Sequence, residues 1–490
     1  MEAQNTTDAL RYSKEENIGT ARYTALSGAM GALGGDFSAM RINPAGGAVF
    51  LNSSLTFSTS LFDVENEANY FNNFEKSVSD NVAINQLGGV YVIDNFNEDS
   101  TFKKFTIGFN YDITKSFDNE LYIAGTGNTS IGEFFLAQAQ GIPLNLLQTN
   151  PNESISDLYQ YLGENQGTAA QNAFLGYQGY LLDAVDPNNP NNTSYISNIA
   201  KGKFNQQYAS VSEGYNSKFT INLSTQITDD YYLGINVNTH TLYFNQSSFL
   251  LENNSNSGST ITRVGFENNL AVNGAGVSAQ FGGIAKIADN LRLGLSLDTP
   301  TWYQISEQTT QYLESRRVFS GQTTTEIVDP RVINVYEDYT LKTPAKVSAS
   351  AAYIFGLNGL ISFDYSYKDY SAMEYSPIQD PFFIRLNNSI ENTFKGASEI
   401  RAGGEYRINQ LSLRGGIHYE ESPYKNSQVL GEIFGFSMGA GYNFGSFTGD
   451  IAYSRSEQQR NQQLYSVGLT DTAEINSIYS NVVLSLGFNF

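Results

Sequence analysis

The last nine residues of the chain alternate between two kinds of side chain. The apolar positions are Val482, Leu484, Leu486, Phe488 and Phe490, and between them lie Val483, Ser485, Gly487 and Asn489. A period of two predicts a β-strand whose two faces differ. A barrel wall needs such a strand where one side meets lipid and the other a polar lumen. The C-terminus therefore predicts one wall strand of a transmembrane β-barrel.

The composition excludes a membrane span made of a helix. In the 490-residue chain no run of consecutive apolar residues approaches 18, the length that a helical span requires. The chain is 13% aromatic and 16% charged, so a role in a membrane has to come from strands. Met1 is followed by neither a basic segment nor an apolar core, so we expect a mature or recombinant form without a secretory signal.

Charge and residue usage exclude several other classes of function. The 28 Lys and Arg against 49 Asp and Glu give a net charge of −21, which argues against binding of nucleic acid. With no cysteine there is no disulfide and no thiolate. Gly435 to Gly439 match a G-x-S-x-G nucleophile motif, but Ser437 lies in mid-strand and both histidines precede it. We therefore expect no enzymatic activity, no cofactor and no metal site.

Alternating segments recur along the rest of the chain. They begin near residues 55, 84, 104, 217, 231, 276, 291, 335, 347, 360, 399, 411, 434, 446 and 478. Only Thr343 and Pro344 interrupt the segments near 335 and 347, so we merge these two into one strand with a proline irregularity. Fourteen strands remain. An even number of strands is typical of outer-membrane barrels in bacteria.

The connections between these strands alternate in length. Tight turns are expected at residues 228–230, 288–290, 356–358, 409–410 and 445, and long connections at 115–215, 246–275, 306–333, 369–396, 420–433 and 455–476. Outer-membrane barrels have short turns on the periplasmic side and long extracellular loops. The sequence thus predicts an all-β fold: a fourteen-stranded antiparallel transmembrane barrel over residues 51–490, in the bacterial outer membrane, with both termini periplasmic.

The polar faces of the strands are expected to line the lumen. These faces carry Asp364, Arg401, Glu405, Arg407, Arg414, His418 and Asp450. Two interpretations are open: a solvated interior whose charges neutralise one another, or a specific ligand site.

The longest connection, residues 115–215, contains helical patterns. Ser130 and Glu133 have the spacing of a capping box, and two further amphipathic stretches follow at residues 155–162 and 168–185. These short helices could cover the mouth of the barrel, capture an apolar ligand or pack on one another. The candidate ligand-binding residues are Phe134, Phe135, Leu136, Leu144, Leu146 and Leu147.

Residues 1–50 precede the first strand and are rich in glycine and alanine, as in Gly28 to Gly35. Small residues allow close packing of the backbone, so this segment is predicted to form a plug, or hatch, inside the barrel. Its arginines, Arg22 and Arg41, are candidates to pair with carboxylates such as Asp36, Glu405 or Asp450.

The chain resembles the FadL-type outer-membrane transporters of long-chain fatty acids and other hydrophobic compounds, in the version seen in Bacteroidota. The residues that carry the resemblance are the block Gly19 to Asp36, the triplet Asn43, Pro44 and Ala45, the stretch Leu291 to Tyr303, the stretch Leu341 to Pro344 with Asp364 and Tyr365, and the terminal Phe490. The resemblance implies that the triplet lies in the hatch. It also implies capture of ligand at an extracellular groove, a shift of the hatch, and lateral release through a gap in the wall.

The function that we expect is passive uptake of hydrophobic small molecules such as long-chain fatty acids. The expected partners are outer-membrane lipid and a hydrophobic ligand. The alternative is a plugged barrel that does not transport and serves as a subunit of a larger secretion or assembly complex, with other envelope proteins as partners. An open diffusion porin is a third class, against which the hatch argues.

Overall fold

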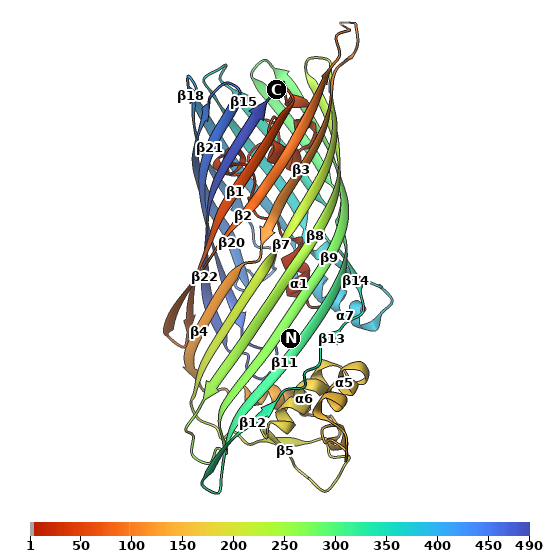
Figure 1. Ribbon diagram of the computed structural model, residues 1–490, viewed down its shortest axis with the longest axis vertical. Coiled ribbons are helices and arrows are strands. Elements are labelled where there is room, and N and C mark those ends of the chain that lie inside the picture. Colours follow the sequence, from red (N-terminus) through yellow and green to blue (C-terminus); the bar gives the residue numbers. More distant parts are fainter. Residues whose placement is uncertain (1–3, 98) are drawn as a thin grey trace.

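The computed structural model describes residues 4–97 and 99–490 and forms a closed antiparallel β-barrel (Figure 1). The barrel has fourteen wall strands, as the sequence predicts, and four of them are each built from two consecutive segments. In order around the wall the strands are β1 (Ser54–Tyr70), β2 (Asn73–Asp94), β3 (Phe102–Ser116) with β4 (Asn119–Gly127), β7 (Phe204–Ile227), β8 (Tyr231–Asn253), β9 (Ile261–Ala288), β10 (Leu291–Asp298) with β11 (Trp302–Phe319), β14 (Tyr339–Lys342) with β15 (Lys346–Ile354), β16 (Gly359–Asp369) with β17 (Glu374–Ser376), β18 (Gly396–Ile408), β19 (Leu411–Glu420), β20 (Leu430–Asn443), β21 (Phe447–Gln463) and β22 (Thr472–Asn489).

The first and last strands close the barrel. β1 pairs with β22 from Ser54 opposite Asn489 to Asn69 opposite Glu474. The expected proline irregularity is also present, because β14 ends at Lys342 and β15 begins at Lys346 on the far side of Pro344. Both segments belong to the same wall strand, since β14 pairs with β11 and β15 with β10.

The two faces of the wall differ in polarity as the alternation predicts. On β22, Leu484 and Phe488 point outward with about half of their surface exposed, whereas Ser485 is buried against the interior. Asp364 and Glu405 are likewise buried inside. In the described ranges 4–97 and 99–490, no helix is both long enough and apolar enough to span a membrane.

The strands extend further than the alternation indicated. The expected loop 115–215 is wrong at both ends, because β4 and the start of β7 pair with each other over residues 119–127 and 204–212. The expected loop 246–275 shrinks to residues 254–260, and 306–333 is largely the hairpin of β11 and β12 (Gln322–Val328). The apolar–polar alternation weakens in these stretches, although ladder hydrogen bonds still form.

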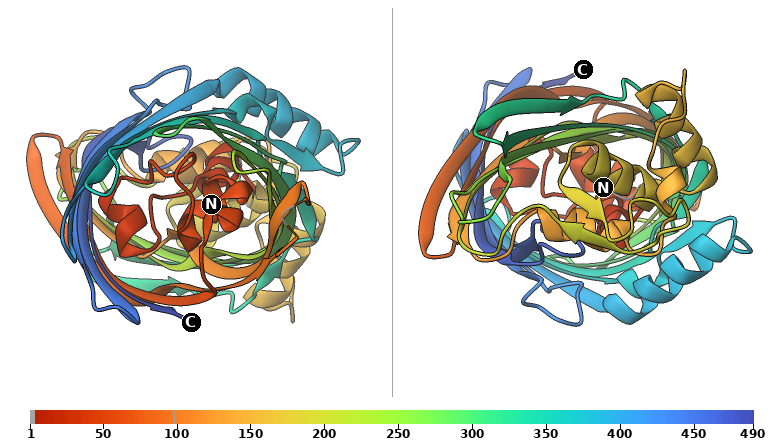
Figure 2. Two further views of the ribbon diagram at one scale, coloured as in Figure 1. Left: turned by 90° about the horizontal axis from the view of Figure 1, so that it is seen from above. Right: turned by 90° about the horizontal axis from the view of Figure 1, so that it is seen from below.

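The N-terminal segment lies inside the barrel, where Figure 2 shows it in red from both ends. It contains α1 (Thr6–Ser13), α2 (Ala21–Ala25), α3 (Phe37–Ile42) and the short helix η1 (Pro44–Val49). Its backbone approaches the wall closely where the wall has glycine: a Cβ on Gly416 would lie 2.6 Å from the carbonyl carbon of Leu26. We call residues 4–50 the plug.

Residues 128–203 form a small helical layer at one end of the barrel. Its elements are α4 (Gly132–Ala139), η2 (Leu144–Leu146), α5 (Ile155–Asn165), α6 (Thr168–Gln178) and the two-stranded sheet of β5 (Leu182–Ala184) and β6 (Tyr195–Ser197). The capping box expected at Ser130 is wrong, because its hydroxyl contacts Glu252 and the N-cap of α4 is Ile131. A capping box does form at Ser154 and Asp157 of α5.

Three elements outside the barrel wall and the plug remain. They are β13 (Asn334–Val335), which pairs with β11, the short helix η3 (Tyr370–Ala372), and α7 (Pro381–Thr393). The expected connection 369–396 therefore holds a helix that was not predicted, and Figure 1 shows it on the outer flank of the barrel.

Candidate functional site

The triplet Asn43, Pro44 and Ala45 attaches the end of the plug to the wall. The side-chain amide of Asn43 donates to the carbonyls of Gly31, in the plug, and Gly283, in β9, at 2.9 and 3.0 Å. Its oxygen accepts the N–H of Ala45 at 3.1 Å, and the carbonyl of Pro44 accepts from Asn222 of β7 at 2.9 Å. The triplet is thus anchored to two wall strands.

Arg22 pairs with a carboxylate of the wall, as expected for a plug residue. Its Nε lies 3.0 Å from Glu405 of β18, which also pairs with Arg407 and Arg414 at 2.6 and 2.7 Å. Arg414 in turn contacts Asp450. One buried carboxylate is therefore shared between one arginine of the plug and two of the wall.

The other two candidate hatch residues act within the plug. Asp36 is the N-cap of α3, where it accepts from the N–H groups of Ser38 and Ala39, and it accepts a hydrogen bond from Thr20. Arg41 forms no ion pair with any carboxylate in residues 4–97 and 99–490. Its Nη2 instead donates to the carbonyl of Ile18 at 2.8 Å and to the hydroxyl of Tyr23 at 3.2 Å.

The wall has a seam between β2 and β3, where the backbone ladder stops early. β2 and β3 pair only from Asp94 opposite Lys104 to Gln86 opposite Asp112. Between Asn73 and Ile84, β2 makes ladder pairs with β1 alone among the described strands. In Figure 2 the orange hairpin of β1 and β2 stands out from the wall. We call the boundary between this part of β2 and the segments β3 and β4 the seam.

Side chains bridge the seam where the ladder is missing. Asn66 and Ser77 donate to the carbonyl of Glu120 at 2.7 and 2.9 Å, and Asn73 donates to the carbonyl of Ala124 at 2.9 Å. Individual side-chain hydrogen bonds of this kind contribute about 0.5–1.5 kcal/mol each. The seam is therefore held by fewer and more separable contacts than a continuous ladder.

The plug covers the seam from inside. The N–H of Glu16 donates to the carbonyl of Thr114 at 2.7 Å, on the stretch of β3 that β2 leaves unpaired. Asn85 of β2 donates to the carbonyl of Gly19 at 2.6 Å. The side chain of Ile18 packs with Phe62 of β1 and Ile113 of β3. Plug residues 16–19 thus contact all three strands that meet at the seam.

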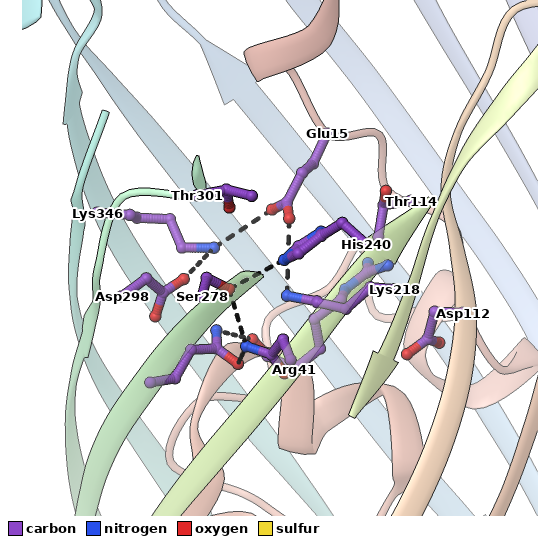
Figure 3. A network of polar contacts seen from close by, with 12 residues as sticks. Glu15, Arg41, Asp112, Thr114, Lys218, His240, Ser278, Asp298, Thr301 and Lys346 are labelled. Atoms are coloured by element: carbon purple, nitrogen blue, oxygen red, sulfur yellow. Dashed lines mark hydrogen bonds and ion pairs between the residues drawn. The ribbon is translucent and has the colours of Figure 1, made fainter. Parts of the chain in front are cut away.

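A polar cavity of about 40 Å³ lies in the lumen beside this part of the plug. Figure 3 shows Glu15 pointing into it toward Lys346 and Lys218, which come from β15 and β7. Lys368 and the carboxylate of Asp298 also line it, together with Pro344, hydroxyl and amide groups, Tyr12 of α1 and His240 of β8.

The six candidate ligand residues lie in the helical layer and pack on one another and on the strands. Phe134, Phe135, Leu144 and Leu147 are buried, while Leu136 and Leu146 are partly buried against the same cluster. The ring of Phe135 meets Phe266 of β9 edge-on at 5.0 Å. The polar cavity does not reach any of the six. Their arrangement is that of a packed layer at the barrel end, and their part in binding remains a proposal.

The residues at the seam and around the cavity were not predicted from the sequence. Glu15, Glu16 and Ile18 lie in the plug outside the block rich in glycine and alanine. Lys218 and Lys346 occupy inward positions of strands that the alternation does predict. Cations on the polar strand faces are the signal that would have indicated both lysines.

The fold and the plug define a class: fourteen-stranded barrels filled by an N-terminal segment. No family model matches the sequence, and no curated protein matches it. Solved structures do match over nearly the whole chain. A Pseudomonas aeruginosa FadL homologue shares 14% identity over 97% of this chain and 100% of its own, with a TM-score of 0.55.

Two further neighbours have the same fold. The toluene transporter TodX of Pseudomonas putida is 13% identical over 98% of this chain and 99% of its own, with a TM-score of 0.52. The monoaromatic hydrocarbon channel CymD is 11% identical over 97% and 98%, with a TM-score of 0.50. The structural neighbours are thus a FadL homologue, a toluene transporter and a monoaromatic hydrocarbon channel, and at 11–14% identity the likeness is one of fold.

Proposed function

We propose that the protein is a passive channel of the bacterial outer membrane for hydrophobic small molecules, long-chain fatty acids among them. The long loops would face the exterior and both termini the periplasm. The helical layer at residues 128–203, with its six apolar candidates, would receive the ligand. The observation that carries the proposal is the contact of plug residues 16–19 with the seam.

The seam supplies a path that avoids the wet lumen. A hydrophobic molecule loses about 25 cal/mol of favourable free energy for each Å² of apolar surface that it exposes to water. Sideways passage between β2 and β3 would lead it past the apolar side chains of Phe62, in β1, and Ile113, in β3, which Ile18 of the plug covers. Release requires plug residues 16–19 to withdraw, since they cover the seam inside.

A reversible crosslink tests this proposal. The natural chain has no cysteine, so Ile18→Cys with Ile113→Cys places a single pair of thiols where the two side chains pack. The matched control is Ser348→Cys with Ser366→Cys, which joins two paired wall strands and leaves residues 16–19 of the plug without a crosslink.

Uptake is measured with radiolabelled oleate and with toluene in cells that express each variant. We expect oxidation to stop uptake in the plug-locked variant only, and reductant to restore it. Equal uptake by the locked and reduced forms would exclude the seam as the route. If both probes enter at the same rate with and without the protein, the transport function itself is wrong, and a subunit role in an envelope complex becomes the better account.

A further inference from the structure

One side of the wall is completed by the helix α7 instead of by paired strands. The ladder between β16 and β18 ends where Asp369 lies opposite Gly396. Beyond that point β17 pairs with β14 alone among the described strands. α7 follows β17 in the chain, and both end views of Figure 2 show this cyan helix outside the ring of strands. A helix therefore takes the place of strand pairing on this flank of the barrel.

The inner face of α7 is used in packing. Phe383 stacks on Tyr375 at 5.8 Å, Ile390 is completely buried, and all three belong to the cluster that contains Leu10 of the plug. The side-chain amide of Asn387 donates to the carbonyl of Tyr375 at 2.9 Å. This packing leaves the outer side of α7 for contacts with another molecule.

Strand register places the start of α7 at the edge of the apolar outer surface of the wall. Ser376, at the end of β17, lies opposite Thr340, which lies opposite Gln304 of β11. Trp302, the only tryptophan of the chain, stands two residues before Gln304 and is 45% exposed. Tryptophan is enriched where lipid headgroups meet the hydrocarbon. α7 therefore begins at the level expected for headgroups.

The other end of α7 returns to the same kind of position. β18 begins at Gly396, and a Cβ on Gly396 would lie 2.0 Å from the hydroxyl of Tyr367, which is exposed on β16. Tyrosine, like tryptophan, is enriched at membrane interfaces. Both ends of α7 are thus tied to interfacial positions, so the helix lies along the edge of the apolar surface.

The outer side of α7 carries a patch of apolar side chains. Ile378, Phe382 and Ile384 are 52%, 38% and 45% exposed. Exposed apolar groups that gather in this way mark a surface for a partner or a membrane. Because this patch continues the apolar outer surface of the wall, lipid is the partner that fits it.

Two cations of α7 and its C-terminal end have no partner within the protein. Arg385 and Lys395 are exposed, and neither side chain forms a hydrogen bond or an ion pair with residues 4–97 and 99–490. Lys425, by contrast, donates to the carbonyl of Glu391 at the end of α7, at 2.8 Å. Unpaired cations beside an apolar patch are complementary to an anionic lipid headgroup.

We propose that α7 is seated in the headgroup layer of the outer leaflet and binds the phosphate of an anionic lipid there. Ile378, Phe382 and Ile384 enter the lipid, and Arg385 and Lys395 donate charge-assisted hydrogen bonds to the phosphate. This inference rests on the proposed place of the protein in the outer membrane, with its long loops outside. It gives a lipid partner to the part of the wall that α7 completes.

Quenching by spin-labelled lipid tests the position of α7. The full-length protein is reconstituted in vesicles of phosphatidylcholine that carry a doxyl label near the headgroup. Phe382→Cys and Asn392→Cys each place a single thiol on α7 for an NBD fluorophore, the first in the apolar patch and the second at an exposed polar position. Phe363→Cys, on the outer surface of the wall, is the reference. We expect quenching at residue 382 to be about twofold stronger than at residue 392.

Two spin-labelled lipids of different charge test the cations. With the fluorophore at residue 382, we expect doxyl-phosphatidylglycerol to quench about twofold more strongly than doxyl-phosphatidylcholine at equal mole fraction. Arg385→Gln combined with Lys395→Gln should abolish this preference. The matched control is Lys201→Gln with Lys203→Gln, which removes the same charge from exposed positions in the helical layer and should preserve the preference.

The inference and the proposed function fail in different ways. Quenching at residue 363 without quenching at residue 382 would show that α7 lies in water, and would overturn the inference while the barrel remains in lipid. No quenching at residue 363 would contradict the proposed membrane location itself. Equal quenching by the two lipids when both cations are present would overturn the anionic partner.

Discussion

The N–H of Glu16 donates a hydrogen bond of 2.7 Å to the carbonyl of Thr114, so a residue of the plug contacts the wall where one strand has left its neighbour. The plug therefore fills the lumen and also completes the wall. Any movement of residues 16–19 changes the barrier between lumen and surroundings at the seam.

Shortening Ile18 should weaken the plug at this point. We expect Ile18→Ala to destabilise the plugged state by about 2–5 kcal/mol, because it leaves a cavity between Phe62 and Ile113. Uptake of toluene should rise, and a bimane fluorophore attached through Asn17→Cys, next to Ile18, should report release of the plug at lower urea concentration. Leu51→Ala is the control, since Leu51 is 80% exposed. Equal effects of the two substitutions would show that Ile18 does not hold the seam.

The ion pairs of Glu405 should be unequal in importance. Arg22→Met removes one of three arginines and leaves Glu405 paired with Arg407 and Arg414, so we expect a loss of about 1 kcal/mol. Glu405→Met leaves Arg22 and Arg414 without this carboxylate in the interior and should cost about 3–5 kcal/mol. Urea unfolding followed by tryptophan emission measures both. A larger loss from Arg22→Met would contradict the shared-carboxylate arrangement.

The sequence predicted the wall better than the plug. All fourteen strands were located because outward apolar and inward polar residues alternate along them, as Leu484 and Ser485 do. The whole of β4 and the first part of β7 were missed because the pattern is weaker there. The helix α7 was not predicted, although it has a local signal: Asp380 as N-cap and Pro381 in the first turn.

No local sequence pattern indicated which wall residues the plug contacts. Glu16 meets Thr114, and Glu15 meets Lys346, from parts of the chain that are distant in sequence. Which inward lysine faces which plug residue depends on the path of the plug through the lumen. Of the expected pairings, that of Arg22 with Glu405 forms, and Arg41 instead binds a carbonyl and a hydroxyl. Periodicity carries no information about such contacts.

Acid should loosen the plug through Glu15. Burial raises the pKa of this carboxyl, but Lys346, Lys218, Lys368 and Arg41 together outweigh it and hold the pKa well below 4.5. A group whose pKa is lowered on folding stabilises the folded state above its unfolded pKa and loses that contribution as pH falls through the folded pKa. The contacts of Glu15 with the three lysines should therefore be unaffected from about pH 8 to about pH 5 and weaken only below pH 4.5.

The measurement is the urea concentration that releases the plug, read from the bimane on residue 17 as a function of pH. Glu15→Gln should remove the part of the acid response that begins below pH 4.5. A response that persists unchanged in Glu15→Gln would assign the acid sensitivity to groups other than Glu15.

Two adjacent glycines of β9 give the sharpest test of the anchor at Asn43. A Cβ on Gly282 would lie 2.0 Å from Oδ1 of Asn43, whereas a Cβ on Gly283 would meet nothing closer than 3.4 Å, at a side-chain atom of Leu233. We expect Gly282→Ala to displace the triplet and to cost about 1–3 kcal/mol through the lost hydrogen bonds of Asn43. Gly283→Ala should be tolerated.

The comparison of these two glycines isolates the anchor from the wall. Because both substitutions change the strand propensity in the same way, a difference between them in urea release of the plug reports the anchor alone. Asn43→Ala should reproduce the effect of Gly282→Ala, and combining the two should add little, since both remove the same contacts. Additive losses would show that Gly282 acts on the barrel wall rather than on the triplet.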